Sequence, residues 1–512
     1  MILWLVLTAV LVWTLVYRYR RRRLYELASR IPGLKEELPV IGLAHSVAGN
    51  NEDIMKTLQR ISCEAMSEDK DGLIRAWLNN LLYFVMVHPA DTEMVLKTCL
   101  EKDDLHKYIR KVIGYGGIFA PVSIWRRRRK ILVPAFSPKI VENFVTVFAK
   151  QSEKLVKHLG NGPNTSFNTW PYLNKYSLDS VCESAMGINL NAQDDPDCAF
   201  LKAINKVLSL ISERIFKIWL QPDWLYRLFP QYPEHERCIK IMHDFTDNVI
   251  TDKRKQLKYD QETKTKIDTN LGLSSYKNKT FLDYLIQFSG GEKGYTDLEL
   301  REEILTLAIA STDTSSVVMG FTLMLLYKYP EVQEKVYQEL HKVFGDSERP
   351  LQKEDLPHLK YLERVIKESM RLFQPVPFII RKVEKELVLP SGRILPAGSG
   401  VVVSLYGMHR NPKYWGPTAE HFDPDRFLPE RFTALQASSF FPFSTGPRAC
   451  LGYQYAYMSM KTALSTILRR YKVLGERESG PIPHIRVRLD IMMKSEEGYH
   501  ITLQRRIQRQ SA

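Results

Sequence analysis

Most of the chain follows the apolar and polar periodicity of amphipathic helices. From about residue 50 to 250, apolar positions recur at helical spacing between polar breaks. The stretch 258–280, rich in Lys, Asp, Thr, Ser and Asn, is typical of an exposed loop. The pattern predicts a mainly helical protein.

The first apolar run, residues 1–17, reads MILWLVLTAVLVWTLVY and carries no charge. As a helix it would span roughly 26 Å, near the lower limit for crossing a bilayer. Five arginines follow within residues 18–23, an order that is the reverse of a cleaved signal peptide. We therefore predict a membrane anchor, with the arginines and the rest of the chain on the cytosolic side. An N-terminal core helix is the alternative.

A second run, residues 297–330, stays apolar on nearly all faces from Ile304 until it ends at Pro330. Asp313 lies in its middle among serines and threonines. Because an Asp at the bilayer centre costs about 2.5–3.5 kcal/mol, a buried central helix with a polar notch is favoured over a membrane span.

Shorter β-type pieces follow residue 373. RKVEKELVLPSGRILPAGSGVVVSLY contains a Pro-Ser-Gly turn, and IRVRLDIMMK and YHITLQRR flank SEEG as expected for a hairpin. IPGLKEELPVIG, behind the anchor, resists helix formation. The expected organisation is an anchor (1–17), a basic and Pro/Gly-rich linker (18–42) and one large domain (43–512).

Composition narrows the partners. The 512 residues include 72 Lys and Arg against 58 Asp and Glu, a formal charge of +14. This excess favours an acidic partner or an anionic membrane surface. No zinc-knuckle spacing, RNA-binding aromatic signature or basic tail indicates nucleic-acid binding. The six cysteines contain no Cys-x-x-Cys pair, which favours a reducing compartment over a disulfide framework.

Cys450 lies in a constrained segment, FPFSTGPRACLGYQYA. The segment lacks periodicity up to Pro447, and a helical pattern follows the cysteine. A helix start, together with Arg448, is expected to lower the pKa of the thiol toward the thiolate. Gly446 and Gly452 leave room for a large flat ligand. A purely structural cysteine is the alternative.

This segment resembles the haem-thiolate signature of the cytochrome P450 family, F-x-x-G-x-R-x-C-x-G. Phe443, Gly446, Arg448, Cys450 and Gly452 match its five fixed positions. The resemblance implies haem b (iron protoporphyrin IX), with Cys450 as the axial iron ligand and Arg448 near a haem propionate. Such a thiolate favours cleavage of the O–O bond.

Two further segments resemble structural motifs of the family. Glu368 and Arg371, in KESMRLFQPVP, are three residues apart and share a helix face. FDPDRF resembles the family's meander motif and supplies Arg426. The resemblance assigns these three residues to a buried network that serves folding and haem retention. Without the resemblance, Glu368 and Arg371 would be an ordinary surface ion pair.

The resemblance also assigns propionate contacts. Trp125 and Arg129, in WRRRRK, are four residues apart on one helix face, and Arg381 lies where the family often has another propionate ligand. For residues 126–128, a solvated basic face and a docking surface for an acidic electron donor both remain open.

ASTDTS, residues 310–315, resembles the family's oxygen-activation motif, A-G-x-D/E-T-T/S. Cleavage of dioxygen requires two protons to enter a dry pocket. Asp313 and Thr314 are expected to relay them, with Thr314 nearest the oxygen. The alternative is that the hydroxyls bond back to the preceding helical turn.

The resemblance covers nearly the whole chain and is greatest to the microsomal, family 4-like (clan 4) animal enzymes, judging from WRRRRKILVPAF and FPFSTGPRACLG. Three positions depart from the pattern. Ala310 replaces a Glu that can attach the haem covalently, so no such link is expected. Ser311 replaces a Gly, which is expected to alter the kink where oxygen binds. Gln374 replaces a common Pro and is expected to matter little.

The resemblance implies the mainly α, minor β cytochrome P450 fold behind a transmembrane anchor in the endoplasmic reticulum membrane. The expected activity is monooxygenation of an apolar substrate, such as a fatty acid, another lipid or a xenobiotic. O2 and NADPH electrons would be used, delivered by NADPH-cytochrome P450 reductase and by cytochrome b5 as a second donor. A haem-thiolate isomerase or dehydratase that does not use O2, and a non-enzymatic membrane binder of haem or apolar ligands, are the alternatives.

Overall fold

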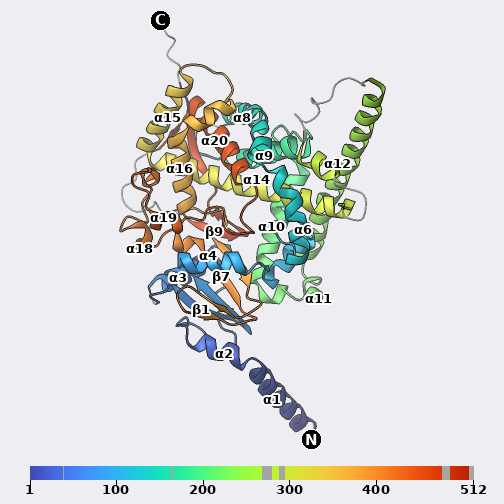
Figure 1. Ribbon diagram of the computed structural model, residues 1–512, viewed down its shortest axis with the longest axis vertical. Coiled ribbons are helices and arrows are strands. Elements are labelled where there is room, and N and C mark those ends of the chain that lie inside the picture. Colours follow the sequence, from blue (N-terminus) through green and yellow to red (C-terminus); the bar gives the residue numbers. More distant parts are fainter. Residues whose placement is uncertain are drawn as a thin grey trace.

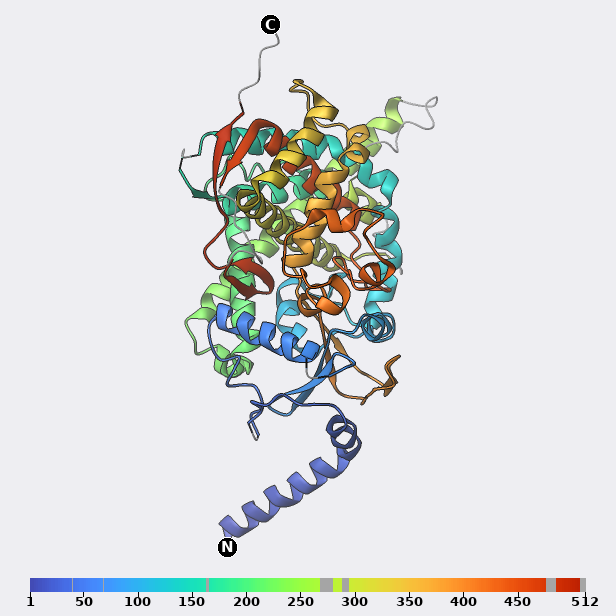
Figure 2. The same cartoon turned by 90° about the vertical axis from the view of Figure 1, so that its left-hand side faces the viewer.

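The computed structural model describes residues 1–38, 40–67, 69–162, 165–267, 280–287, 294–475 and 485–506. Its first helix, α1 (Ile2–Arg20), projects from the body of the protein and has no buried residue (Figures 1 and 2). α1 and α14 (Asp297–Lys328) are each long and apolar enough to cross a membrane, but most of α14 is buried inside the protein. α1 is therefore the candidate anchor.

The next helix, α2 (Arg22–Ser29), packs on the body through the buried residues Leu24, Leu27 and Ala28. Arg23 forms an ion pair with Glu386 at 3.1 Å. The first part of the segment expected to be a linker is thus a docked helix.

The body is mainly helical, which confirms the predicted fold class. Its helices before α14 are α3 (Asn51–Ser67), α4 (Pro89–Thr98), α5 (Lys107–Ile113), α6 (Val122–Ala135), α7 (Pro138–Val141), α8 (Val145–Gly160), α9 (Trp170–Val181), α10 (Ala199–Phe216), α11 (Asp223–Tyr226), α12 (Gln231–Ile267) and α13 (Phe281–Gln287). After α14 come α15 (Pro330–Phe344), α16 (Lys360–Leu372), α17 (Leu405–Met408), α18 (Pro412–Trp415), α19 (Ala434–Ser438) and α20 (Tyr453–Arg470).

The prediction of a loop over 258–280 is wrong for residues 258–267, because α12 continues to Ile267. Its Lys, Gln and Glu residues are good helix formers, so a polar composition did not exclude a helix. The remainder, 268–279, lies outside the described residues.

The strands form small sheets beside the helices, and β10 lies against the central helix α14. One sheet has the order β1-β2-β7-β4, with strands β1 (Leu73–Leu78), β2 (Leu81–Met86), β7 (Gly400–Ser404) and β4 (Phe378–Lys382). Around the predicted Pro-Ser-Gly turn, β5 (Leu387–Val388) pairs with β6 (Ile394–Leu395). The other strands are β3 (Phe167–Asn168), β8 (Tyr471–Leu474), β9 (Val487–Asp490), β10 (Met492–Ser495) and β11 (His500–Arg505).

The predicted C-terminal hairpin is wrong in its pairing. β9 and β10 pair with each other, and β11 pairs with β3 and β8 instead. The chain reverses at Ile491, whose φ is 63°. A β-branched residue rarely adopts this conformation, so the sequence carried no turn signal there.

α14 crosses the middle of the body, as the sequence predicted (Figure 1). Thr296 and Glu299 form a capping box at its start. The helix is uninterrupted through residues 310–315, where Ser311, a better helix former than Gly, stands in place of the usual Gly. It therefore positions the polar notch at the centre of the protein.

Candidate active site

Cys450 lies in a loop that ends just before α20. Its backbone N–H donates to the Phe443 carbonyl at 2.9 Å, and Ser444 and Gly446, both at positive φ, turn the chain between them. The Cys450 side chain is exposed, yet burial by the surrounding protein raises the pKa of its thiol. The thiol therefore faces a hollow within the protein rather than open solvent.

The sequence predicted a lowered pKa for the Cys450 thiol, and this prediction is wrong for the polypeptide alone, where the pKa is raised. The Gly452 N–H and Arg129 do lower the pKa, as a helix start and a nearby cation should. Desolvation is the larger effect, because it disfavours the thiolate where no ligand shares its charge.

The two glycines of the loop have different surroundings. A Cβ on Gly446 would lie 2.7 Å from the Leu96 carbonyl oxygen, so this glycine lets the loop contact α4. A Cβ on Gly452 would come no closer than 3.8 Å to another residue. Gly452, rather than Gly446, leaves free space beside the cysteine.

Buried cations surround this loop, and three of them are predicted site residues. The Arg448 guanidinium lies 4.4 Å from the centre of the Trp125 ring. Arg381, on β4, is 2% exposed, and burial followed by repulsion from Arg448 lowers its pKa to about 10. Burial lowers the pKa of Arg129, which lies near Cys450.

These cations have few carboxylate partners. Among the described residues, Arg129 and Arg381 form no ion pair, and Arg448 reaches only Glu101, at 3.9 Å. Arg448 instead donates to the Ala120 carbonyl at 2.8 Å. Buried charges without counter-charges are costly, so the cluster calls for an anionic ligand.

Lys102 and Arg110 extend the cluster and were missed by the sequence analysis. Burial and repulsion from Arg381 and Arg448 hold the pKa of Lys102 well below its usual value. No motif marked these residues, because only the fold brings them to β4 and the cysteine loop.

The polar notch of α14 has two faces. Leu307, Ala310, Ser311 and Thr314 are half-buried within an otherwise buried stretch, and their spacing places them on one helix face. This stripe is open to the interior hollow. It carries no carboxylate, consistent with Ala310 in place of the family's Glu.

Asp313 lies on the other face and is fully buried. Its Oδ1 is 2.9 Å from Nζ of Lys494 on β10, a partner that the sequence analysis missed. Thr314 donates its hydroxyl to the Ala310 carbonyl at 2.7 Å, which is the back-bonded arrangement considered as the alternative. No hydrogen bond joins Asp313 to Thr314 in the described part of the chain.

Glu368, Arg371 and Arg426 lie together in one buried network. Arg371 donates to both oxygens of Glu368, at 2.7 and 2.8 Å, and Arg426 lies 3.4 Å from Glu368 Oε1. Backbone carbonyls, including those of His409 and Trp415, accept further guanidinium hydrogens, whereas Arg426 Nε has no hydrogen-bond partner among the described residues. This network differs from the cations near Arg448 because it contains its own carboxylate, which faces both guanidinium groups.

Neither reading of residues 126–128 holds for Arg128, which is 2% exposed. It contacts Glu302 at 2.7 Å and Glu303 at 3.3 Å, and donates to the Tyr115 carbonyl at 2.5 Å. Arg128 therefore ties α6 and the loop before it to α14, whereas Arg126 is exposed.

Two more residues hold the cysteine loop: His409, which the sequence analysis missed, and Gln374, which it expected to matter little. His409 Nε2 accepts a hydrogen bond from the Phe441 N–H at 3.1 Å. Gln374 donates to the Pro442 carbonyl at 2.7 Å, so its replacement of Pro adds a contact that was not expected. The Phe443 ring packs on Tyr457, 5.2 Å between ring centres.

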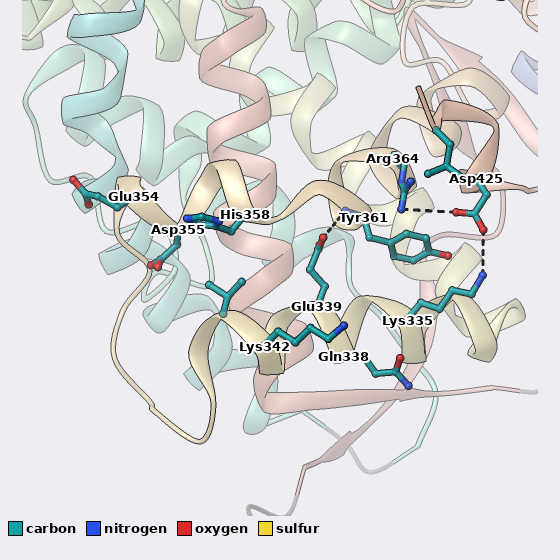
Figure 3. A pocket seen from close by; sticks show the side chains of 12 residues that line it. Lys335, Gln338, Glu339, Lys342, Glu354, Asp355, His358, Tyr361, Arg364 and Asp425 are labelled. Carbon is teal, nitrogen blue, oxygen red and sulfur yellow. Dashed lines mark hydrogen bonds and ion pairs between the residues drawn. The ribbon is translucent and has the colours of Figure 1, made fainter. Parts of the chain in front are cut away.

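A hollow of about 930 Å³ on the surface, between α15 and α16, contains none of the predicted site residues (Figure 3). Its charged groups pair with one another: Asp425 lies 3.1 Å from Lys335 and 3.8 Å from Arg364. It is a separate, internally neutralised surface feature.

The comparisons agree with this site. A family model described as Cytochrome P450 matches residues 32–502. The chain is 33% identical to cytochrome P450 4c3 of Drosophila melanogaster, over 91% of this chain and 88% of the relative. It is 34% identical to cytochrome P450 4V2 of Pongo abelii, over 85% and 82%. It is also 33% identical to cytochrome P450 4c21 of Blattella germanica, over 92% and 94%.

The chain therefore belongs to the cytochrome P450 family. Its similarity is to family 4 animal members, and it is a haem monooxygenase, an oxidoreductase that uses O2, a lipophilic substrate and a redox partner. Members bind haem b through a cysteine thiolate.

The residues present fit haem b. Haem b carries two propionate carboxylates. These are the counter-charges that Arg381 and Arg448 need. Nε of both arginines has no hydrogen-bond partner among the described residues. The Cys450 thiol supplies a sulfur donor facing the hollow.

Proposed function

We propose that Cys450 is the axial haem ligand of an NADPH-dependent monooxygenase that hydroxylates an apolar substrate. The observation that carries the proposal is the Cys450 thiol, which is accessible yet desolvated and lies near half-buried Arg129, together with the cations Arg381 and Arg448, whose one carboxylate contact among the described residues is Glu101 at 3.9 Å. Bound haem supplies the activation of O2, which the thiolate promotes.

The residues of the chain have separate tasks in this proposal. Trp125, Arg129, Arg381 and Arg448 orient the haem by binding its propionates, and their positive charge favours the bound state. Gly452 leaves space beside the sulfur, and the loop bond to Phe443 fixes the Cys450 backbone.

Asp313 and Thr314 move protons to the oxygen site. Thr314 belongs to the stripe open to the hollow, which places its hydroxyl on the side where oxygen and substrate would bind. Since Asp313 faces away from it, a proton passes between them through water or through rotation of the Thr314 hydroxyl. Leu307 and Ala310 exclude bulk water from the same face.

We propose fatty acids, other lipids and xenobiotics as substrate classes, because the stripe carries Leu307 and Ala310 beside two hydroxyls and no charged side chain. Electrons would come from NADPH-cytochrome P450 reductase, with cytochrome b5 as a second donor. The arginines behind α1 favour the endoplasmic reticulum membrane with the catalytic domain in the cytosol. Protease digestion of the body in sealed microsomes without detergent would support this orientation, and protection would contradict it.

The carbon monoxide difference spectrum of the reduced protein tests the haem ligation. The wild type is expected to give the strongly red-shifted Soret band of thiolate ligation, and Cys450→Ala should lose it. Cys238→Ala, a buried cysteine on α12, is the matched control and should keep it. A band typical of histidine ligation in the wild type would contradict the proposal.

A further inference from the structure

Asp313 and Lys494 form an ion pair buried in the centre of the protein. The two side chains are 0% and 6% exposed, and the Asp313–Lys494 distance is 2.9 Å. Neither carboxylate oxygen of Asp313 has any other polar partner among the described residues. The state of this acid therefore depends on one lysine.

The C-terminal hairpin holds Lys494 in place. Its ammonium lies 4.9 Å from the centre of the Trp170 ring, and that ring stacks on Tyr499 at 5.3 Å. The neighbouring Met493 N–H donates to the Pro375 carbonyl at 2.9 Å. The reversal at Ile491 returns the chain so that β10 lies beside α14. Lys494 thus has little freedom to leave Asp313.

Burial and charge act on Asp313 in opposite directions. Desolvation is the largest effect and leaves the pKa of Asp313 above its usual value; the Lys494 charge and hydrogen bond lower it, and the neighbouring carboxylate of Asp490 raises it. Tyr499 also lies near Asp313, whose charge raises the pKa of the tyrosine. Without Lys494, desolvation and Asp490, both of which favour the protonated acid, would remain around Asp313 among the described residues.

We propose that Lys494 is a positioning residue for proton delivery, which keeps Asp313 ionised and turned toward the terminal hairpin. This inference rests on the proposed function of Asp313. An ionised Asp313 can take up a proton from the hairpin side and pass it on. Without Lys494, the pKa of Asp313 would be higher and the acid would stay protonated. A weaker acid passes its proton on more slowly.

The first experiment uses infrared spectroscopy of the full-length holoenzyme at neutral pH. Lys494→Met should show the carbonyl band of a protonated, buried carboxylic acid. The band should be absent from the wild type and from the double variant Asp313→Asn/Lys494→Met. The same band in the wild type, or no band in Lys494→Met, would overturn the inference. The double variant lacks the acid, so it assigns the band to Asp313. The wild-type spectrum needs no lysine variant, so it remains informative if Lys494→Met folds poorly.

The second experiment measures product formed per NADPH consumed, with dodecanoic acid as the probe substrate and added reductase. Lys494→Met is expected to lower this ratio roughly tenfold, and Lys494→Arg, which keeps the charge, should restore most of it. Lys253→Met is the matched control: Lys253 is buried in a similar ion pair, 3.1 Å from Asp283, outside the candidate site. An equal loss in the control, or no loss in Lys494→Met, would overturn a positioning role.

The outcomes separate this inference from the proposed function. A red-shifted carbon monoxide band in Lys494→Met shows that haem ligation is intact, so a lower product ratio would then report on Asp313. The infrared measurement does not require turnover. It decides the charge of Asp313 even in a chain that hydroxylates nothing, and the wild-type carbon monoxide spectrum decides the haem ligation separately.

Discussion

Two groups of buried charges flank the cysteine loop, and they differ in completeness. In the Glu368 network (Glu368, Arg371 and Arg426), one buried carboxylate faces both guanidinium groups and backbone carbonyls accept from each, although Arg426 Nε has no hydrogen bond among the described residues. In the Arg448 cluster (Lys102, Arg129, Arg381 and Arg448), the described residues supply only a distant contact with Glu101.

The difference separates a folding element from a binding element. A complete network gains nothing from a ligand, so its contribution is present in the chain alone. An incomplete cluster destabilises the chain alone and recovers that energy when an anion binds. Both groups are arginine-rich and buried, so the missing carboxylates are what distinguish them.

The largest expected effect comes from breaking the complete network. Glu368→Gln leaves Arg371 and Arg426 buried without a carboxylate, and should lower the free energy of unfolding by about 3–5 kcal/mol. Urea unfolding measures the change. Glu93→Gln, which breaks an ion pair with Lys97 whose two side chains are exposed, is the control and should cost less than about 1 kcal/mol. Equal losses would mean that the network is not special.

Removing one cation from the incomplete cluster should stabilise the haem-free protein but weaken the binding of haem. Arg381→Met removes one repelling charge, so the haem-free protein should gain about 1–4 kcal/mol of stability. The same variant should release haem roughly tenfold faster, because one propionate loses a charged hydrogen bond. Urea unfolding and haem transfer to apomyoglobin measure the two effects.

Lys382→Met, on the same strand but exposed, is the control for Arg381→Met and should change stability by less than about 0.5 kcal/mol. A haem-free protein destabilised by Arg381→Met would contradict the incomplete cluster.

The cluster also predicts a pH dependence. Burial and the nearby Lys102 lower the pKa of His106 from 6.5 to about 3. Between these values the unfolded chain binds the extra proton, so the His106 contribution to stability is present above pH 6.5 and is lost as pH falls toward 3. The stability difference between wild type and His106→Gln, measured at stepwise pH, should show this loss. Haem should weaken it, because propionates offset the positive charge.

The smallest effect concerns the contact between the end of α16 and the cysteine loop. Gln374→Pro removes the hydrogen bond to Pro442 and should lower stability by about 1 kcal/mol, measured as a shift in Tm. The control is Gln338→Ala, at an exposed position on α15, which should leave Tm unchanged. Gln352 is not used as a control because its side chain caps a helix. An unchanged Tm in Gln374→Pro would restore the expectation that this departure matters little.

Features encoded locally were predictable from the sequence. The unbroken apolar run of α1, the notch of α14 and the open space at Gly452 each occupy a short segment, whereas the role of Gly446 depends on α4 and was not predicted. Their interpretation required only helix periodicity and one motif. The pairing of Glu368 with Arg371 followed from a spacing of three on one helix.

Features that depend on distant segments were not predictable. Arg128 reads as part of a basic surface until the fold brings Glu302 and Glu303 against it. The reversal at Ile491 has no turn residue, so the hairpin pairing was misassigned. The pKa of Cys450 depends on how much protein surrounds it, which no helix-start rule contains.

The docking of α2 has a consequence for encounters at a membrane. Arg21 donates to the Asn80 carbonyl at 2.9 Å, and Arg23 pairs with Glu386, so the root of α1 is fastened to the sheet. A body on a flexible tether would sample every tilt above the lipid. A fastened root restricts that tilt, so partners diffusing in the same plane would collide with a narrower range of faces, and a larger fraction of collisions would be productive.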